Sequence, residues 1–194
     1  LDRRYGACPP AACGWSNIVQ VTVTNAIDDD GTSIHWHGLL QQETPWMDGV
    51  PGVDQCPIAS GQTFTYKFRA DLYGTGWYHS HVEAQFASGL YGPMVIYGPT
   101  HVDYDVDLGP VVAADYYHEY YQDILAGYLA KDLRITKSDN NLINGRNPYQ
   151  GNCAPRSSFS FTSGKKIRVR LINPSAYALQ KISIDGHKFT VIAN

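Results

Sequence analysis

Two short histidine motifs constrain this chain more than any other feature. His35 and His37 are separated by one residue, as are His79 and His81, and each pair lies in a stretch typical of a β-strand. Because successive side chains of a strand point to opposite faces, both histidines of a pair project from the same face. Two such strands packed together would bring four imidazoles to one place. Imidazole is the commonest transition-metal ligand, so the sequence predicts a multi-histidine metal site.

The number of histidines bears on the kind of metal site. A catalytic zinc ion takes three protein ligands and keeps an open position, so four histidines indicate more than one metal ion. A zinc lyase or hydrolase of the carbonic anhydrase type is an alternative, but it would leave one pair unexplained. Two unrelated pairs, each satisfied by its own hydrogen bonds, are the alternative without metal. The intervening Trp36 and Ser80 point to the opposite face and are expected to pack rather than to bind.

Composition narrows the class of protein. Charged residues make up 17% and aromatic residues 12%, with 18 glycines and 11 prolines, a mixture that suits a turn-rich β protein and is too apolar for disorder. A net charge of −3 gives no basic surface for nucleic acid and no polybasic membrane patch. No apolar run approaches the roughly 20 residues of a membrane helix. We therefore expect neither nucleic-acid nor membrane partners.

The cysteines bear on the cellular compartment. Cys8 and Cys13 could close a small disulfide loop, whereas Cys56 and Cys153 are isolated in the sequence. Four cysteines in a loop-rich chain favour an oxidising compartment, although the chain has no Asn-x-Ser/Thr acceptor. We expect an extracellular protein. There is no signal peptide and no initiating methionine, as expected for a processed or excised chain.

Hydrophobic alternation and turn signals predict mostly strands, and strands 8–12 residues apart indicate a sandwich or barrel. The expected strands are 18–25, 33–40, 64–68, 77–81, 94–97, one opening at Pro110, 159–161, 167–171, 182–184 and 189–192. A surface helix is expected over 119–130, and the Pro- and Gly-rich loop 42–61 is expected to wrap over a site. We predict a first domain over 1–100, a connector over 101–109 and an incomplete second domain over 110–194.

Several ordered motifs make the chain similar to a known family. They are His35-Trp36-His37-Gly38, Trp46-Met47-Asp48-Gly49, Asp54-Gln55-Cys56-Pro57-Ile58, Gly76-Trp77-Tyr78-His79-Ser80-His81, Gly89-Leu90-Tyr91-Gly92-Pro93, Tyr104 to Pro110, Leu142-Ile143-Asn144-Gly145 and Ile184-Asp185-Gly186-His187. Together they resemble the N-terminal portion of fungal laccases, which are multicopper oxidases. The resemblance implies an all-β fold: a cupredoxin-like Greek-key β-barrel or sandwich domain followed by part of a second one.

The same resemblance assigns roles to the histidines. His35 resembles a ligand of a type-2 copper, His37 and His79 resemble ligands of one type-3 copper, and His81 resembles a ligand of the other. The implied cofactor is copper, held in a trinuclear cluster. The implied activity is one-electron oxidation of phenols at a type-1 copper, with electrons passing to the cluster, where O2 is reduced to two waters. Lignin degradation is the implied setting.

Two carboxylates also match the family. Asp48 resembles an acid behind the type-2 copper that orients water and relays protons, although an Asp-Gly turn residue is the alternative. Asp139 resembles a pocket carboxylate that accepts the phenol proton in some members, although a surface aspartate is equally compatible with its position. The remaining histidines, His101, His118 and His187, are expected to be structural.

Departures from the family pattern limit the activity that we expect of this chain alone. Cys153 has no flanking histidine and does not match the type-1 copper motif, which in the family lies in a C-terminal domain. Cys56 resembles a cysteine that pairs with that C-terminal region, and the segment before Ile18 departs from the usual first strand. The whole protein is expected to be a monomer. An isolated chain of this length is expected to bind copper weakly and not to oxidise phenols, so a non-catalytic copper-binding fragment is an alternative.

Overall fold

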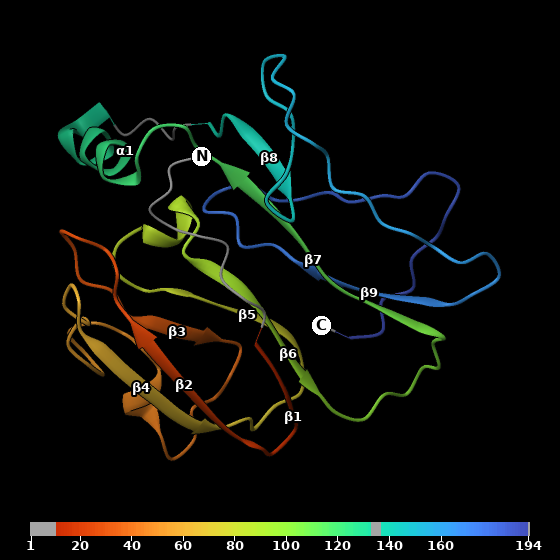
Figure 1. Ribbon diagram of the computed structural model, residues 1–194, viewed down its shortest axis with the longest axis horizontal. Coiled ribbons are helices and arrows are strands. Elements are labelled where there is room, and N and C mark those ends of the chain that lie inside the picture. The colour runs from red at the N-terminus through yellow and green to blue at the C-terminus, as the bar shows by residue number, and fades with distance from the viewer. Residues whose placement is uncertain (1–10, 133–136, 194) are drawn as a thin grey trace.

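The computed structural model describes residues 11–132 and 137–193, and Figure 1 shows how their elements are arranged. Within these ranges the chain forms nine strands and one α-helix of seven residues. The prediction of an all-β fold is confirmed. Within these described ranges, no helix is long and apolar enough to cross a membrane.

The first half of the chain contains a four-stranded sheet and a two-stranded sheet. The larger sheet has the order β1 (Ala11–Gly14), β6 (Tyr91–Tyr97), β5 (Gly74–Ser80), β3 (Ile34–His37), and the smaller one pairs β2 (Ile18–Thr24) with β4 (Thr63–Arg69). All neighbours are antiparallel except β1 and β6. Strand β1 lies in the segment that departs from the family pattern, so part of that segment does form a strand.

The core of this half lies between the two sheets. It contains Ile34, Trp36, Ile58, Tyr66, Phe68, Ala70, Met94 and Ile96. Trp36 is 2% exposed, and its ring centroid lies 4.9 Å from that of Phe68 and 5.5 Å from that of Tyr66. Because the side chains of β3 alternate, burying Trp36 turns His35 and His37 away from the core. The predicted packing of Trp36 and Ser80 is confirmed.

The second half forms a three-stranded sheet of order β8 (Asn140–Ile143), β7 (Val106–Tyr116), β9 (Ile167–Ile172). The predicted helix is present in its central part as α1 (Tyr121–Gly127), followed by a π-helical turn over Tyr128–Asp132. Strand β7 begins four residues before Pro110, where we expected a connector. An irregularity between Asp107 and Pro110 lets the pairing with β9 continue back to Val106.

Three predicted strands are wrong. Residues 159–161, 182–184 and 189–192 lie in the described part of the chain but form no strand. Alternating apolar residues favour a strand only where a neighbouring strand completes the hydrogen bonds. Here the nearby backbone hydrogen bonds close turns instead, from Lys165 N to Thr162 O and from His187 N to Ile184 O.

The structure describes three of the four cysteines. Cys13 lies in β1 and packs against the core, and burial raises the pKa of its thiol. Cys56 and Cys153 are exposed free cysteines. Cys13 is also a free cysteine, so the suggested disulfide with Cys8, a residue outside the described ranges, is not borne out.

A buried arginine joins the two halves. Arg170, on β9, is 3% exposed and donates two hydrogen bonds of 3.0 Å and one of 2.6 Å to the carboxylate of Asp107. Its Nη1 also donates to Thr75 Oγ1 on β5 at 2.8 Å, and its guanidinium lies over the ring of Tyr97, 5.3 Å from the centroid. A buried guanidinium is tolerated because it is paired in this way. It fixes β9 against the strand that carries His79.

Loss of the charge on Asp107 is expected to destabilise the fold. Burial raises the pKa of this carboxyl, but the hydrogen bonds from Arg170 and from the Gly109 N–H outweigh burial and lower the pKa below its usual range. The ion pair therefore contributes stability above about pH 4, the ordinary pKa of aspartate, and loses it as the pH falls through the lower folded-state pKa. We expect the melting temperature of the unaltered protein to fall more steeply with acid than that of Asp107→Asn. Equal slopes would contradict this role.

Candidate metal centre

The pairing of β3 with β5 places the two histidine motifs side by side. These strands are antiparallel, and His35 lies directly opposite His79 while His37 lies opposite Trp77. Directly opposite residues in an antiparallel pair have Cβ atoms about 4.5–5.5 Å apart. The convergence predicted from the sequence is therefore built by backbone register.

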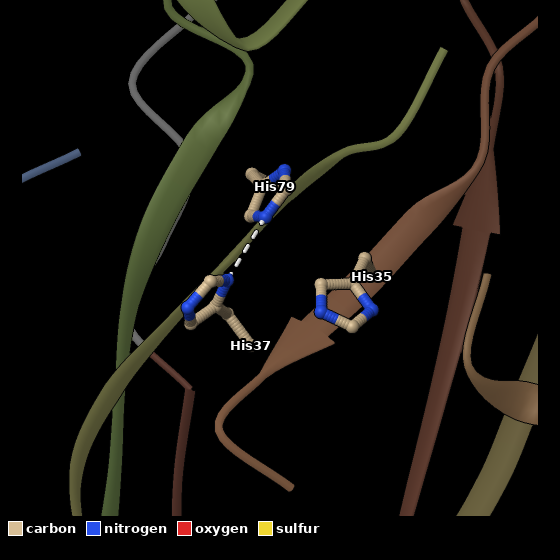
Figure 2. A group of neighbouring side chains, drawn as sticks. All are labelled: His35, His37 and His79. Atoms are coloured by element: carbon tan, nitrogen blue, oxygen red, sulfur yellow. Dashed lines mark hydrogen bonds between the residues drawn. The ribbon is translucent and has the colours of Figure 1, made fainter. Parts of the chain in front are cut away.

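Three of the four imidazoles form a tight group, shown in Figure 2. One ring nitrogen of each of His35, His37 and His79 lies within 4.8 Å of the others. The nearest approach is 3.4 Å, between His37 Nδ1 and His79 Nε2. His81 follows the end of β5 and lies beside this group, with its ring centroid 5.4 Å from that of His35 and 5.9 Å from that of His79.

Backbone carbonyls decide which nitrogens can bind a metal. His79 Nδ1 lies 2.7 Å from its neighbour's carbonyl, Ser80 O, and His35 Nδ1 lies 2.9 Å from Asp48 O. A carbonyl oxygen only accepts, so Nδ1 carries the proton in both rings. The Nε2 lone pairs of His35 and His79 are therefore free for a metal ion, with each ring held by its other nitrogen.

The environment keeps His37 and His79 neutral. His79 is 8% exposed, and burial, together with the nearby histidines, lowers its pKa to about 4. Burial and the neighbouring His35 also lower the pKa of His37. A neutral imidazole is the form that binds metal, so these two rings can bind at neutral pH without first losing protons.

The donor set fits copper. Two nitrogens that share one ion at about 2.0–2.1 Å lie roughly 3–3.4 Å apart, which matches the separation of His37 Nδ1 and His79 Nε2. Imidazole nitrogens suit copper and zinc better than magnesium or calcium. His37 and His81 are exposed, so further ligands could approach from the open side.

Loop 42–61 places Asp48 beside His35. At Gly49 the loop lies so close to β3 that a Cβ would overlap the carbonyl oxygen of Ile34, and its φ is +84°, so a glycine is required there. The Asp48 carboxylate oxygen Oδ1 lies 3.2 Å from His35 Nδ1. This oxygen is buried and has no hydrogen-bond partner among the described residues, so it can accept a proton or orient a water.

Aromatic rings form one wall of the site. Trp77 stacks on His79 with centroids 4.2 Å apart and planes 26° apart, and its ring centroid lies 5.1 Å from that of His37. Phe86 lies 5.4 Å from His79. The shared strand face of Trp77 and His79 is visible in the sequence, whereas the contact with Phe86 depends on the turn after β5.

Comparisons with known proteins identify the family of this chain. A multicopper oxidase family profile matches residues 7–101, and a second one matches residues 107–194. Laccase-1 of Botryotinia fuckeliana is 45% identical over 187 residues, which are 95% of this chain and 32% of that protein. Dihydrogeodin oxidase of Aspergillus terreus is 41% identical over 198 residues, again 95% of this chain and 32% of that protein. The chain belongs to the multicopper oxidase family.

Solved structures of multicopper oxidases share the fold. The laccase of Botrytis aclada superposes with a TM-score of 0.81 at 39% identity, covering 87% of this chain and 33% of that chain. Fet3p, a multicopper oxidase that functions in iron import, gives a TM-score of 0.68 at 33% identity, covering 72% of this chain and 27% of that one. The cupredoxin-like fold expected from the sequence is confirmed. The chain spans about a third of the curated relatives that it matches.

Other candidate residues of this multicopper oxidase chain lie apart from the group of three histidines. Asp139 is exposed just before β8, and its Oδ2 accepts a hydrogen bond from the backbone N–H of His118 at 2.7 Å. The ring of His118 packs edge-on against Tyr149, and His187 Nδ1 donates to the carbonyl of Asp185. These contacts agree with structural roles for His118 and His187, and the role of Asp139 stays a prediction.

The hydrogen bonds to the carbonyls predict the tautomers of two rings. In the metal-free protein at neutral pH, we expect His35 and His79 to carry their proton on Nδ1, because both rings donate from this nitrogen. Nitrogen-15 correlation spectra of the imidazoles distinguish the two tautomers. Protonation of Nε2 in either ring would contradict the assignment of Nε2 as the metal-binding atom.

Proposed function

We propose that this chain is the portion of a laccase-type multicopper oxidase that supplies four histidines to a trinuclear copper cluster. The observation that carries the proposal is the convergence of His35, His37 and His79, with His81 beside them, in a chain of this family. The proposed whole enzyme oxidises phenols in one-electron steps and reduces O2 to water. Four electrons delivered in one pocket avoid release of partly reduced oxygen.

The geometry supports an assignment of the four histidines to different copper ions. His37 Nδ1 and His79 Nε2 face each other at 3.4 Å and would share one type-3 copper. His81 lies outside the group of three and would serve the second type-3 copper. His35, held by the carbonyl of Asp48, would serve the type-2 copper.

Copper, when bound, would supply the redox chemistry, and the chain's own residues would prepare the site for it. The carbonyls of Ser80 and Asp48 orient two rings, and Trp77 and Phe86 shield His79 from water. The Asp48 carboxylate, 3.2 Å from His35 Nδ1, would hold or deliver a proton as oxygen is reduced to water.

The rest of the proposal concerns the whole protein. We assign residues 1–100 to the first cupredoxin-like domain, 101–109 to a connector and 110–194 to part of a second domain, which agrees with family matches over 7–101 and 107–194. The type-1 copper and the remaining ligands would come from a C-terminal domain. We further propose an extracellular monomer that acts on small phenols, with no nucleic-acid or membrane partner.

Two alternatives make different predictions about the metal. A zinc enzyme would use three histidines and an open position, which leaves the fourth imidazole without a role. A copper-binding chain without catalysis would hold the metal but would not oxidise phenols. The four clustered rings favour copper over zinc, and the family match favours an oxidase.

The proposed activity is tested on the whole protein that contains this chain. We expect copper in excess of zinc by elemental analysis, a copper(II) electron paramagnetic resonance signal, and consumption of O2 with a methoxyphenol but without hydrogen peroxide. His37→Ala should abolish oxygen reduction and lower the copper content, whereas His187→Ala, in an exposed turn, should leave both unchanged. A protein with stoichiometric zinc and no copper signal would refute the proposal.

Substitution of Asp48 tests the proton step. Asp48→Asn keeps the shape of the side chain and the carbonyl that holds His35 but removes the negative charge. We expect copper content to be retained while turnover falls roughly 10–100-fold, as for other residues that support metal ligands. Steady-state oxygen uptake across a pH series measures the effect. Unchanged turnover would assign Asp48 to the turn alone.

A further inference from the structure

A buried polar network lies behind the second histidine motif. Ser80, between His79 and His81, is fully buried and points away from the metal site. Its hydroxyl donates to Gln85 Oε1 at 2.6 Å and accepts from the backbone N–H of Val82 at 3.2 Å. The backbone segment that carries both histidines is therefore linked to Gln85 through the Ser80 hydroxyl.

Gln85 uses every hydrogen-bonding group of its amide. Oε1 accepts from Ser80 and also from the hydroxyl of Thr32 at 3.0 Å. Nε2 donates to Asp30 Oδ2 and to the carbonyl of Gly31, both at 2.8 Å. Since hydroxyls face one end of the amide and groups that only accept face the other, a flipped amide would lose the bonds to Asp30 and Gly31. The side chain is fully buried, so leaving any of these groups unpaired would be costly.

The network continues into the second half of the chain. Asp30 Oδ2 also accepts a hydrogen bond from the hydroxyl of Tyr121 at 3.0 Å, and Tyr121 is the first residue of α1. Tyr121 is 3% exposed, and α1 lies against the 3-10 turn Gln85–Ser88. Burial and the Asp30 carboxylate raise the pKa of this hydroxyl well above its usual range, so it remains a donor.

We propose that Tyr121, Asp30 and Gln85 are positioning residues that transmit the docking of α1 to the His79–Ser80–His81 backbone. The second half of the chain, which contributes no histidine to the group of three, would thus set where two of the metal-site histidines lie. The link to copper rests on the proposed function, whereas the link to backbone position does not. Networks of this kind have effects larger than single contacts because each bond orients the next.

Two tyrosine variants test the proposal with a matched control. Tyr121→Phe removes only the hydroxyl that donates to Asp30. Tyr117→Phe removes an equivalent bond in the same half of the chain, from Tyr117 to Asp115 Oδ2 at 3.2 Å, away from the network. Both changes are nearly isosteric, so both proteins should fold. A purely structural role would lower the melting temperature alike in the two variants.

The first measurement is amide hydrogen exchange over residues 79–85 in the metal-free whole protein. We expect exchange to accelerate about tenfold in Tyr121→Phe, as for the loss of one hydrogen bond to a charged acceptor, and to stay unchanged in Tyr117→Phe. Unchanged exchange in Tyr121→Phe, or equal acceleration in both variants, would overturn the proposal. Accelerated exchange in Tyr121→Phe, together with a failure of the unaltered protein to take up added copper, would support it while refuting the proposed function.

The second measurement addresses the metal site in the copper-loaded whole protein. We expect Tyr121→Phe to alter the copper(II) paramagnetic resonance spectrum and to lower kcat with little change in the KM for phenol. Tyr117→Phe should leave the spectrum and kcat unchanged. A Tyr121→Phe protein with the unaltered spectrum and kcat would show that the network does not reach the histidines.

Discussion

The site depends on one constraint, the register in which β3 and β5 pair. Trp36 lies opposite Tyr78 in this register, and both contribute to the core, so burial of the two aromatic rings fixes the alignment. The same alignment places His35 opposite His79 on the other face. A slip of one residue would turn every side chain of β3 to the wrong face and would bury the histidines. Core packing therefore specifies how the histidines of the candidate metal site converge.

Buried polar contacts at both ends of β5 then hold this strand in place. At its beginning, the hydroxyl of Thr75 accepts a hydrogen bond from Arg170 of β9, and at its end Ser80 donates to Gln85, which is joined through Asp30 to Tyr121. Both series of hydrogen bonds connect the second half of the protein to β5, the strand that carries His79. Polar contacts have strict geometry, so they orient the two halves more narrowly than apolar packing would.

The sequence predicted the parts of this arrangement that are encoded locally. Alternation in β2 and β4, the inward side of Trp36 and the shared face of the histidines all follow from the two-residue period of a strand. The contacts of Arg170, and those of Gln85 with Asp30, Gly31 and Thr32, could not be found this way, because they span 50 to 100 residues and leave no periodic pattern. The three wrong strands have the same cause. Their apolar alternation is local, but a strand also needs a neighbour distant in the sequence.

Charge explains why an acid belongs beside this histidine group. The imidazoles of His37 and His79 are held neutral, so they contribute ligands without compensating the charge of a bound cation. A bound metal cation adds positive charge to this face, and nearby negative charge lowers the cost of holding it. The buried Oδ1 of Asp48 lies 3.2 Å from His35 Nδ1, where it can supply this charge or take up a proton. Since Gly49 alone allows the loop to approach β3 so closely, the glycine after Asp48 is as necessary to the site as the carboxylate.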